Sequence, residues 1–138
     1  MAKKKTYRMY GFVPYNISPI QQGIQFGHAV VEYANKYGDK KSYRNWATKD
    51  KTFIILNGGT TKYHKKKELQ GSMQTICDEL DKFGIRYATF DEPDLNDALT
   101  GIVFLVESKV FDFEINYELT EQPKEAIFAL WLKGKRLA

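Results

Sequence analysis

The sequence predicts a three-layer α/β/α sandwich, in which helices cover both faces of a mixed, mostly parallel sheet of four to five strands and a further helix closes the chain. Three observations predict it. Short apolar runs alternate with longer helical patterns. A hydrophobic content of 43% excludes a disordered chain, and 138 residues suffice for one core. We therefore expect a single domain over residues 1–138, with its core at about 7–106 and a C-terminal extension at 107–138.

The clearest helix signal lies at Pro19–Tyr37. Ser18 is expected as its N-cap and Gln21 as the third position of a capping box, and Gly38 is expected to end it. Residues at spacings of three and four predict one buried stripe on this helix. The stripe comprises Ile20, Ile24, Gly27 with His28, Val31 and Ala34.

Apolar runs and their glycine or proline ends place the other elements. Strands are predicted at Tyr7–Pro14, Thr52–Leu56, Ile85–Phe90 and Leu99–Val106, and helices at about Lys66–Phe83 and Pro123–Lys135. Strict alternation from Phe111 to Leu119 predicts a fifth, half-buried extended segment, whereas the polar residues 39–51 predict a long loop. The apolar face of the last helix has to be buried, either over the sheet's edge or in a self-association surface such as a homodimer.

Charge is distributed unevenly along the chain. Residues 1–67 hold 14 lysine and arginine residues against three acidic ones, and residues 68–138 hold seven against 14. If the fold gathers the basic side chains, they form a surface for a polyanion such as tRNA or another nucleic acid. Alternatively, they belong to solvated loops. These side chains are Lys3–Lys5, Lys40, Lys41, Arg44, Lys49, Lys51, Lys62 and Lys65–Lys67.

Several functional classes are disfavoured by composition. The only cysteine, Cys77, cannot form an internal disulfide and is expected as a packed thiol. Two histidines and one cysteine far apart predict no metal site, and no cofactor motif is present. No apolar run approaches the roughly 20 residues that span a bilayer, and the first residues do not resemble a secretory signal. We expect a cytoplasmic protein without a membrane partner.

Ligands of open α/β sheets bind beyond the carboxyl ends of the strands. Asn57, Gly58, Gly59 and Thr60 follow the second strand and predict either an anion-binding nest or a plain turn. His28 is expected as a core imidazole rather than a catalytic group. The acidic cluster from Asp91 to Asp97 predicts a general base or cation site, or a polar turn fixed by Pro93.

One family combines several of these features. Gln25-Phe26-Gly27-His28-Ala29 on the first helix, the buried strand after it, and Asp91 ahead of Thr100-Gly101-Ile102 resemble the type 2 peptidyl-tRNA hydrolase superfamily over about residues 7–106. The family's signature places Gly-Lys, two residues and then Ala-Gln-x-x-His-Ala at the start of this helix, and its Gln-x-x-His-Ala part stands here at Gln25–Ala29. The acidic cluster and the segment after it are closest to small members from bacteria and tailed phages.

The resemblance implies roles for particular residues. Asp91 would orient or activate water, Thr100 would correspond to a family threonine, and Gln21 falls on the family's catalytic lysine. Leu95 replaces the threonine of the family's Asp-Ala-Gly-x-Thr turn. The substrate-binding residues expected from the resemblance and from the strand ends together are Gln25, His28, Asn57, Gly58, Gly59, Thr60, Lys62 and Lys65.

Two functions follow from the resemblance. One is a binding protein for RNA, nucleotide or a protein partner, with a degenerate catalytic site. The other is an active hydrolase of peptidyl-tRNA or a related nucleotide ester, in which Gln21→Lys would raise turnover if the rest of the site is intact.

Overall fold

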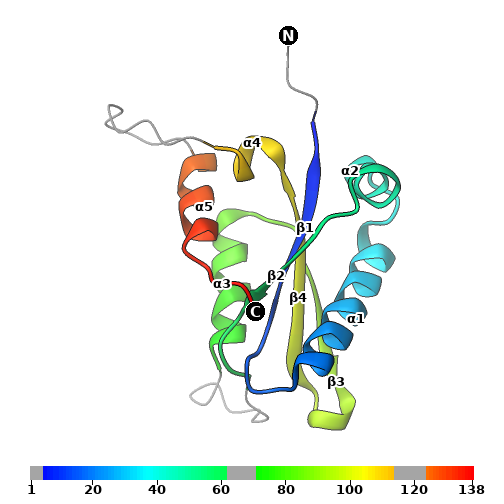
Figure 1. Ribbon diagram of the computed structural model, residues 1–138, viewed down its shortest axis with the longest axis vertical. Coiled ribbons are helices and arrows are strands. Elements are labelled where there is room, and N and C mark those ends of the chain that lie inside the picture. Colours follow the sequence, from blue (N-terminus) through cyan, green and yellow to red (C-terminus); the bar gives the residue numbers. More distant parts are fainter. Residues whose placement is uncertain (1–4, 62–70, 114–123) are drawn as a thin grey trace.

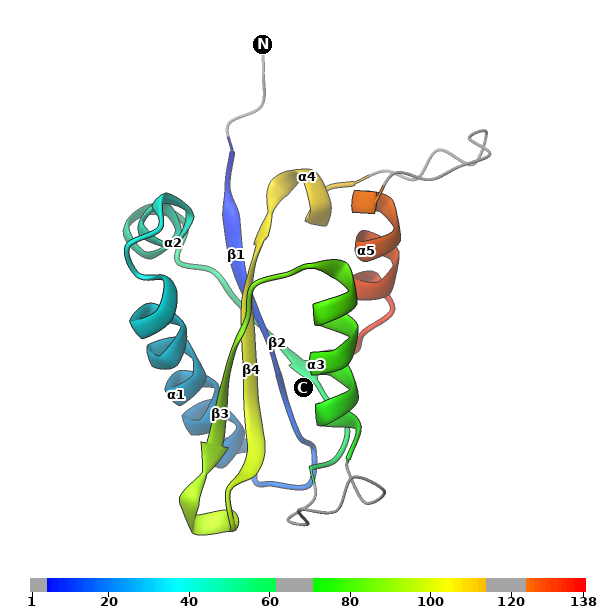
Figure 2. The same cartoon turned by 180° about the vertical axis from the view of Figure 1, so that it is seen from behind.

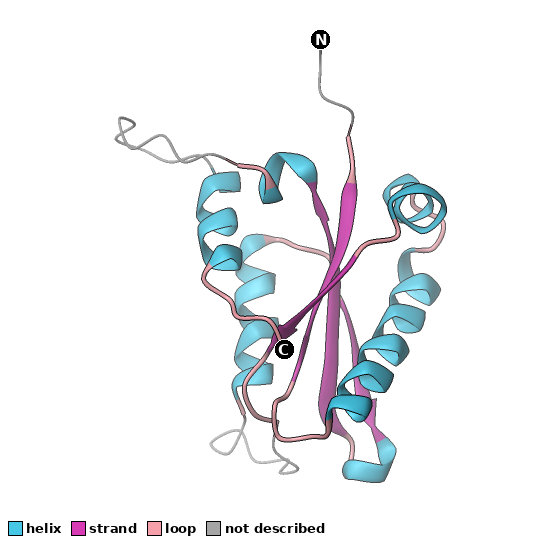
Figure 3. Cartoon of the chain, in the orientation of Figure 1, coloured by secondary structure: helices cyan, strands magenta, loops and turns pink. Residues whose placement is uncertain are grey.

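The computed structural model describes residues 5–61, 71–113 and 124–138. It confirms the expected α/β fold with a C-terminal helix: a mixed sheet has helices on both faces (Figures 1 and 3). The strands are β1 (Tyr7–Val13), β2 (Phe53–Asn57), β3 (Ala88–Glu92) and β4 (Ala98–Glu107). The helices are α1 (Pro19–Tyr37), α2 (Lys41–Asn45), η1 (Trp46–Asp50), α3 (Ser72–Phe83), η3 (Pro93–Leu95), α4 (Ser108–Phe111) and α5 (Lys124–Lys133).

The strand order is β2-β1-β4-β3. β1 and β2 pair in parallel, whereas β4 runs antiparallel to both β1 and β3. The sheet is thus mixed, as expected, but not mostly parallel, since two of its three strand pairings are antiparallel. β1, β2 and β3 therefore run in the same direction, and their carboxyl ends lie at the same end of the sheet, the lower end in Figure 1. α1 packs on one face of the sheet, and α3 and α5 pack on the other (Figure 2).

The ends of α1 agree with the sequence, but its buried face does not. Ser18 is the N-cap, and its Oγ accepts the Gln21 N–H at 3.3 Å. The expected buried stripe is wrong, because Ile20, Ile24 and Val31 are 77%, 44% and 58% exposed and His28 is exposed as well. The opposite face is buried instead. It presents two large aromatic rings to the sheet and comprises Gln25, Phe26, Ala29 and Tyr33.

Two other expectations need correction. Residues 39–51 are not a loop but contain α2 and η1, because Trp46 is buried and its indole N–H donates to the Thr52 carbonyl at 2.9 Å. α3 begins at Ser72 rather than at Lys66, since Gly71 has an extended backbone at the N-cap; residues 66–70 lie outside the described residues. Cys77 is a buried thiol, as expected.

The C-terminal extension packs mainly on a face of the sheet, whereas the expectation was the sheet's edge or a self-association surface. α5 buries Phe128, Ala129 and Leu132 on the α3 face, although Ile127 stays exposed. The last residues pair with the edge strand β2. Phe111 lies in α4 and not in an extended segment, and residues 114–119 of the expected fifth strand lie outside the described part of the chain. None of the helices that the structure describes is long and apolar enough to cross a membrane.

Deleting residues 136–138 is expected to lower the free energy of unfolding by about 1–3 kcal/mol. Two backbone hydrogen bonds would be lost: Asn57 N–H to the Arg136 carbonyl at 2.8 Å, and Ala138 N–H to the Ile55 carbonyl at 3.0 Å. The loss also uncovers the edge of β2. Urea unfolding of both proteins measures the difference. An unchanged transition midpoint would show that this tail contributes nothing.

Candidate functional site

Three of the residues singled out in the sequence meet between α1 and the sheet. Gln25 and Thr100 are both 0% exposed, and Thr100 Oγ1 donates to Gln25 Oε1 at 2.6 Å. Gln25 Nε2 in turn donates to Gln21 Oε1 at 3.3 Å, which extends the chain of hydrogen bonds to the exposed first turn of α1. We call this chain the Gln21–Gln25–Thr100 network. Amides and a hydroxyl make it a neutral network of donors and acceptors.

A β-bulge brings Thr100 to α1. Phe90 pairs with Gly101, but the next residue of β3, Asp91, pairs with Leu99, so that Thr100 is left without a partner. Such a bulge re-aims the side chain of the extra residue. Gly101 then lets α1 approach closely, since a Cβ atom there would lie 2.7 Å from the Gln25 carbonyl oxygen and 2.9 Å from Ala29 Cβ. A glycine within a predicted strand was the sequence signal for this irregularity.

His28 lies on the same side of α1, seven residues after Gln21. Its ring stacks on that of Phe90, with centroids 4.4 Å apart and planes at 14°. Because His28 is exposed, it is not the core imidazole that the sequence suggested. The stacked pair instead offers an aromatic surface beside the Gln21–Gln25–Thr100 network.

Asp91 lies on the opposite face of the sheet. Its register partner Leu99 packs into the α3-side core, and Asp91 lines a cavity of 560 Å³ together with Cys77 of α3. Desolvation raises the pKa of Asp91, and repulsion from Asp97 raises it further. Burial likewise raises the pKa of Cys77 to about 12. Asp91 is therefore separated by the sheet from Gln25 and Thr100, with which the family resemblance groups it.

Asp91→Asn is expected to stabilise the protein at neutral pH. A raised pKa means that the folded state binds a proton more tightly than the unfolded state, so ionised Asp91 opposes folding. The gain in the free energy of unfolding from Asp91→Asn should shrink as pH falls through the folded-state pKa of Asp91. It should vanish below 3.8, the ordinary pKa of an aspartate carboxyl group. Urea unfolding at several pH values measures it, with Asp39→Asn on the exposed surface as the control. A gain that is independent of pH would contradict the assignment.

The segment Asn57–Thr60 forms a turn rather than an anion-binding nest. Asn57 Oδ1 accepts the Gly59 N–H at 2.8 Å, and Ser72 Oγ accepts the Thr60 N–H at 2.9 Å. The N–H groups of Asn57 and Gly58 donate to the carbonyls of Arg136 and Val13. All four backbone donors that a nest would offer are thus used within the chain.

The described basic side chains do not converge on Gln21. Five of them lie on or beside α2 and η1, after the C-terminal end of α1: Lys40, Lys41, Arg44, Lys49 and Lys51. The 19 residues of α1 span about 28 Å, which separates these side chains from Gln21. We call them the α2 basic group. Lys62 and Lys65, which the resemblance places against phosphate, lie outside the described residues, as do Lys3, Lys4, Lys66 and Lys67.

In residues 5–61, 71–113 and 124–138, no group of three histidine, cysteine or acidic side chains is arranged to hold a metal ion. What the site offers is a neutral hydrogen-bonding network, an exposed aromatic stack and a distant basic group. A comparison with protein-family models and with curated proteins finds no match for this chain.

Proposed function

We propose that the protein is a type 2 peptidyl-tRNA-hydrolase-like binding protein, which holds the 3′-terminal nucleotide of an RNA and does not cleave it. The observation that supports binding over catalysis is the Gln21–Gln25–Thr100 network. The residue at the family's lysine position is an uncharged amide engaged with Gln25, and Asp91 lies across the sheet from it. No charge is therefore available at Gln21 to stabilise an oxyanion.

An RNA end suits the chemistry around this network. A nucleobase can stack on the exposed side of the His28–Phe90 pair, as bases stack on aromatic side chains in single-stranded RNA complexes. The Gln21 side chain still has its amide N–H groups to donate to a base edge or a ribose hydroxyl. The α2 basic group lies about 28 Å away, where it can contact phosphates further along the same strand.

Hydrolysis is the second candidate, and one observation favours it. The raised pKa of Asp91 brings it closer to the range of a general base. An ester would then have to bind on the α3 face of the sheet, in the cavity that Asp91 lines with Cys77. The Gln21–Gln25–Thr100 network would take no part in such a reaction.

The binding test uses a labelled RNA hairpin with a short 3′ overhang and fluorescence anisotropy. His28→Ala removes the stacking surface and is expected to weaken binding about 5- to 150-fold, since stacking contributes roughly 1–3 kcal/mol per base. Asn35→Ala, on an exposed position two turns further along α1, is the control. Equal affinity of the two variants, or no binding by the unmodified protein, would contradict the proposal.

The salt dependence of the same binding tests the role of the α2 basic group. Lys41→Gln with Arg44→Gln is expected to weaken binding and to flatten the dependence of affinity on salt, because fewer phosphates are neutralised. Lys82→Gln with Lys133→Gln removes the same charge from α3 and α5 and serves as the control. Equal slopes for both double variants would show that the RNA does not reach α2.

A further inference from the structure

β4 has an open edge near its C-terminal end. The pairing of β3 with β4 starts at Ala88 and Val103, so in the described residues no strand pairs with Leu105–Glu107 on that side. The other side of β4 pairs with β1, where Leu105 faces Met9. The Met9 N–H donates to the Thr52 carbonyl, on the β2 side of β1. Met9 and Leu105 therefore do not hydrogen-bond to each other. The backbone groups of Leu105, and of Glu107 two residues later, therefore point to the open edge.

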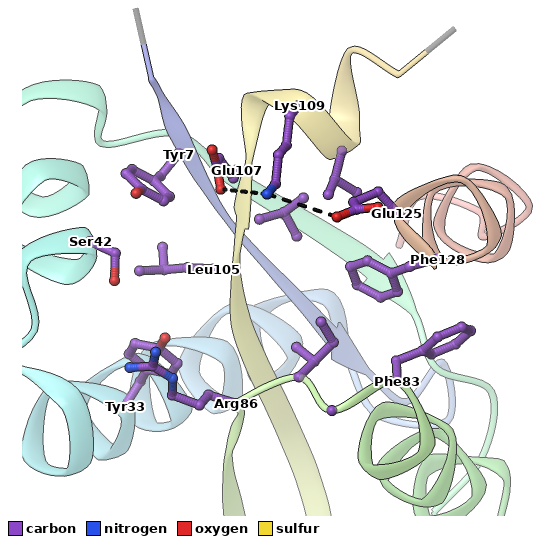
Figure 4. Close-up of a pocket in the computed structure, with 14 residues that line it drawn as sticks. Tyr7, Tyr33, Ser42, Phe83, Arg86, Leu105, Glu107, Lys109, Glu125 and Phe128 are labelled. Carbon is purple, nitrogen blue, oxygen red and sulfur yellow. Dashed lines mark ion pairs between the residues drawn. The ribbon is translucent and has the colours of Figure 1, made fainter. Parts of the chain in front are cut away.

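A pocket of 390 Å³ surrounds this edge (Figure 4). Its volume lies within the usual range of ligand sites, about 300–1,000 Å³. On the α1 side of β4, Tyr33, Ser42 and Arg86 line it. On the other side, Phe83 and Phe128 supply an apolar wall.

The two halves of the pocket also differ in charge. Glu107 lies on the α1 side of β4 with its register partner Tyr7, and Lys5 at 3.4 Å and Lys109 at 3.9 Å offset its charge. On the apolar side, the carboxylate of Glu125 lies 4.0 Å from Lys109. No described carboxylate lies within 4 Å of Arg86, and Arg86 is exposed. The α1 half therefore presents a cation without a carboxylate partner beside hydroxyl groups, which suits an acidic side chain.

We propose that the pocket binds an extended peptide segment of a partner protein, which adds a short strand to the open edge of β4 in line with β3. Successive side chains of a strand point to opposite faces of a sheet. One side chain would then enter the half with Arg86, and the next would enter between Phe83 and Phe128. The expected segment alternates acidic and apolar residues, and its backbone hydrogen-bonds to Leu105 and Glu107. The proposal does not rest on the proposed RNA binding, because the pocket contains neither the Gln21–Gln25–Thr100 network nor the His28–Phe90 pair.

The probe is a capped five-residue peptide of alternating glutamate and leucine, titrated into ¹⁵N-labelled protein and followed by NMR. We expect the amide signals of Leu105 and Glu107 to shift, and Arg86→Gln to weaken binding about tenfold or more. Arg136→Gln, on the exposed C-terminal tail outside the pocket, is the matched control and should bind as the unmodified protein does. A peptide with lysine in place of glutamate should bind more weakly.

A peptide with N-methylated backbone amides separates strand addition from simple occupation of the pocket. It keeps the side chains but cannot donate backbone hydrogen bonds, so we expect its binding to be lost. Equal binding of the methylated peptide, equal affinity of Arg86→Gln and Arg136→Gln, or no binding at about 1 mM peptide would overturn the proposal.

Discussion

Thr100→Val is expected to lower the free energy of unfolding by about 2 kcal/mol. The substitution keeps the shape of the side chain but removes the hydroxyl that donates to Gln25 Oε1 at 2.6 Å. Because Gln25 is fully buried, its oxygen would then lack this partner in a place that water does not reach. Urea unfolding measures the loss, and Thr89→Val, the same change on the partly exposed β3, is the control. Similar losses for both variants would contradict a stabilising role of the network.

The double variant Gln25→Leu with Thr100→Val tests the pair itself. Removing both partners leaves no unsatisfied buried oxygen, so the loss should be smaller than the sum of the single losses. Additive losses would show that the two side chains act independently. The RNA affinity of Thr100→Val should fall as well, because Gln25 would no longer hold Gln21 in one position.

Gly101→Ala is expected to lower the free energy of unfolding by about 2–3 kcal/mol. The added methyl group would lie 2.7 Å from the Gln25 carbonyl oxygen, a backbone atom that no change of rotamer can move away. α1 would have to shift from the sheet, which would also displace the Gln21–Gln25–Thr100 network. We expect weaker RNA binding together with the loss of stability.

Gly27→Ala on the exposed side of α1 is the matched control for this substitution. A Cβ atom at Gly27 would meet no atom within 4 Å apart from its chain neighbours and the backbone of α1 itself. Since glycine inside a helix costs about 1 kcal/mol relative to alanine, Gly27→Ala should stabilise the protein by roughly that amount. The two substitutions are thus expected to act with opposite signs. A neutral Gly101→Ala would contradict the close approach of α1 to β4.

Local sequence signals predicted the four strands and the three longest helices, but not α2, η1 and α4, nor which face of α1 is buried. The Ser18-Pro19 start and the Gly38 end are local features, and the helix has those ends. Its burial depends on the sheet, because α1 has apolar residues on two opposite faces. Periodicity detects both stripes and cannot choose between them. The sheet selects the one with Phe26 and Tyr33, which bury the larger aromatic surface.

Only part of the candidate site could be predicted from the sequence, because it depends on which face of the sheet each strand side chain points to. Side chains of a strand alternate between faces, so a shift of one residue moves a side chain to the other side of the sheet. The bulge at Thr100 introduces such a shift, and it places Thr100 with Gln25 while Asp91 faces α3. The family resemblance therefore singled out Gln25 and Thr100, but the separation of Asp91 from them required the strand register.

This separation changes the expectation for Gln21→Lys. The resemblance predicts that a lysine at this position raises hydrolysis if the remaining site is intact. In the structure Asp91 lies on the far side of the sheet, so a charge at Gln21 would have no partner aspartate with which to act on one ester. We therefore expect no gain in turnover from this substitution.

The most direct test measures binding and hydrolysis of one defined peptidyl-tRNA by the unmodified protein and by Gln21→Lys. We expect the unmodified protein to bind the RNA. We expect neither protein to hydrolyse the ester faster than the uncatalysed reaction. Turnover by the unmodified protein that Asp91→Asn abolishes, or a gain of about two to three decades in Gln21→Lys, would contradict a protein that binds without cleaving.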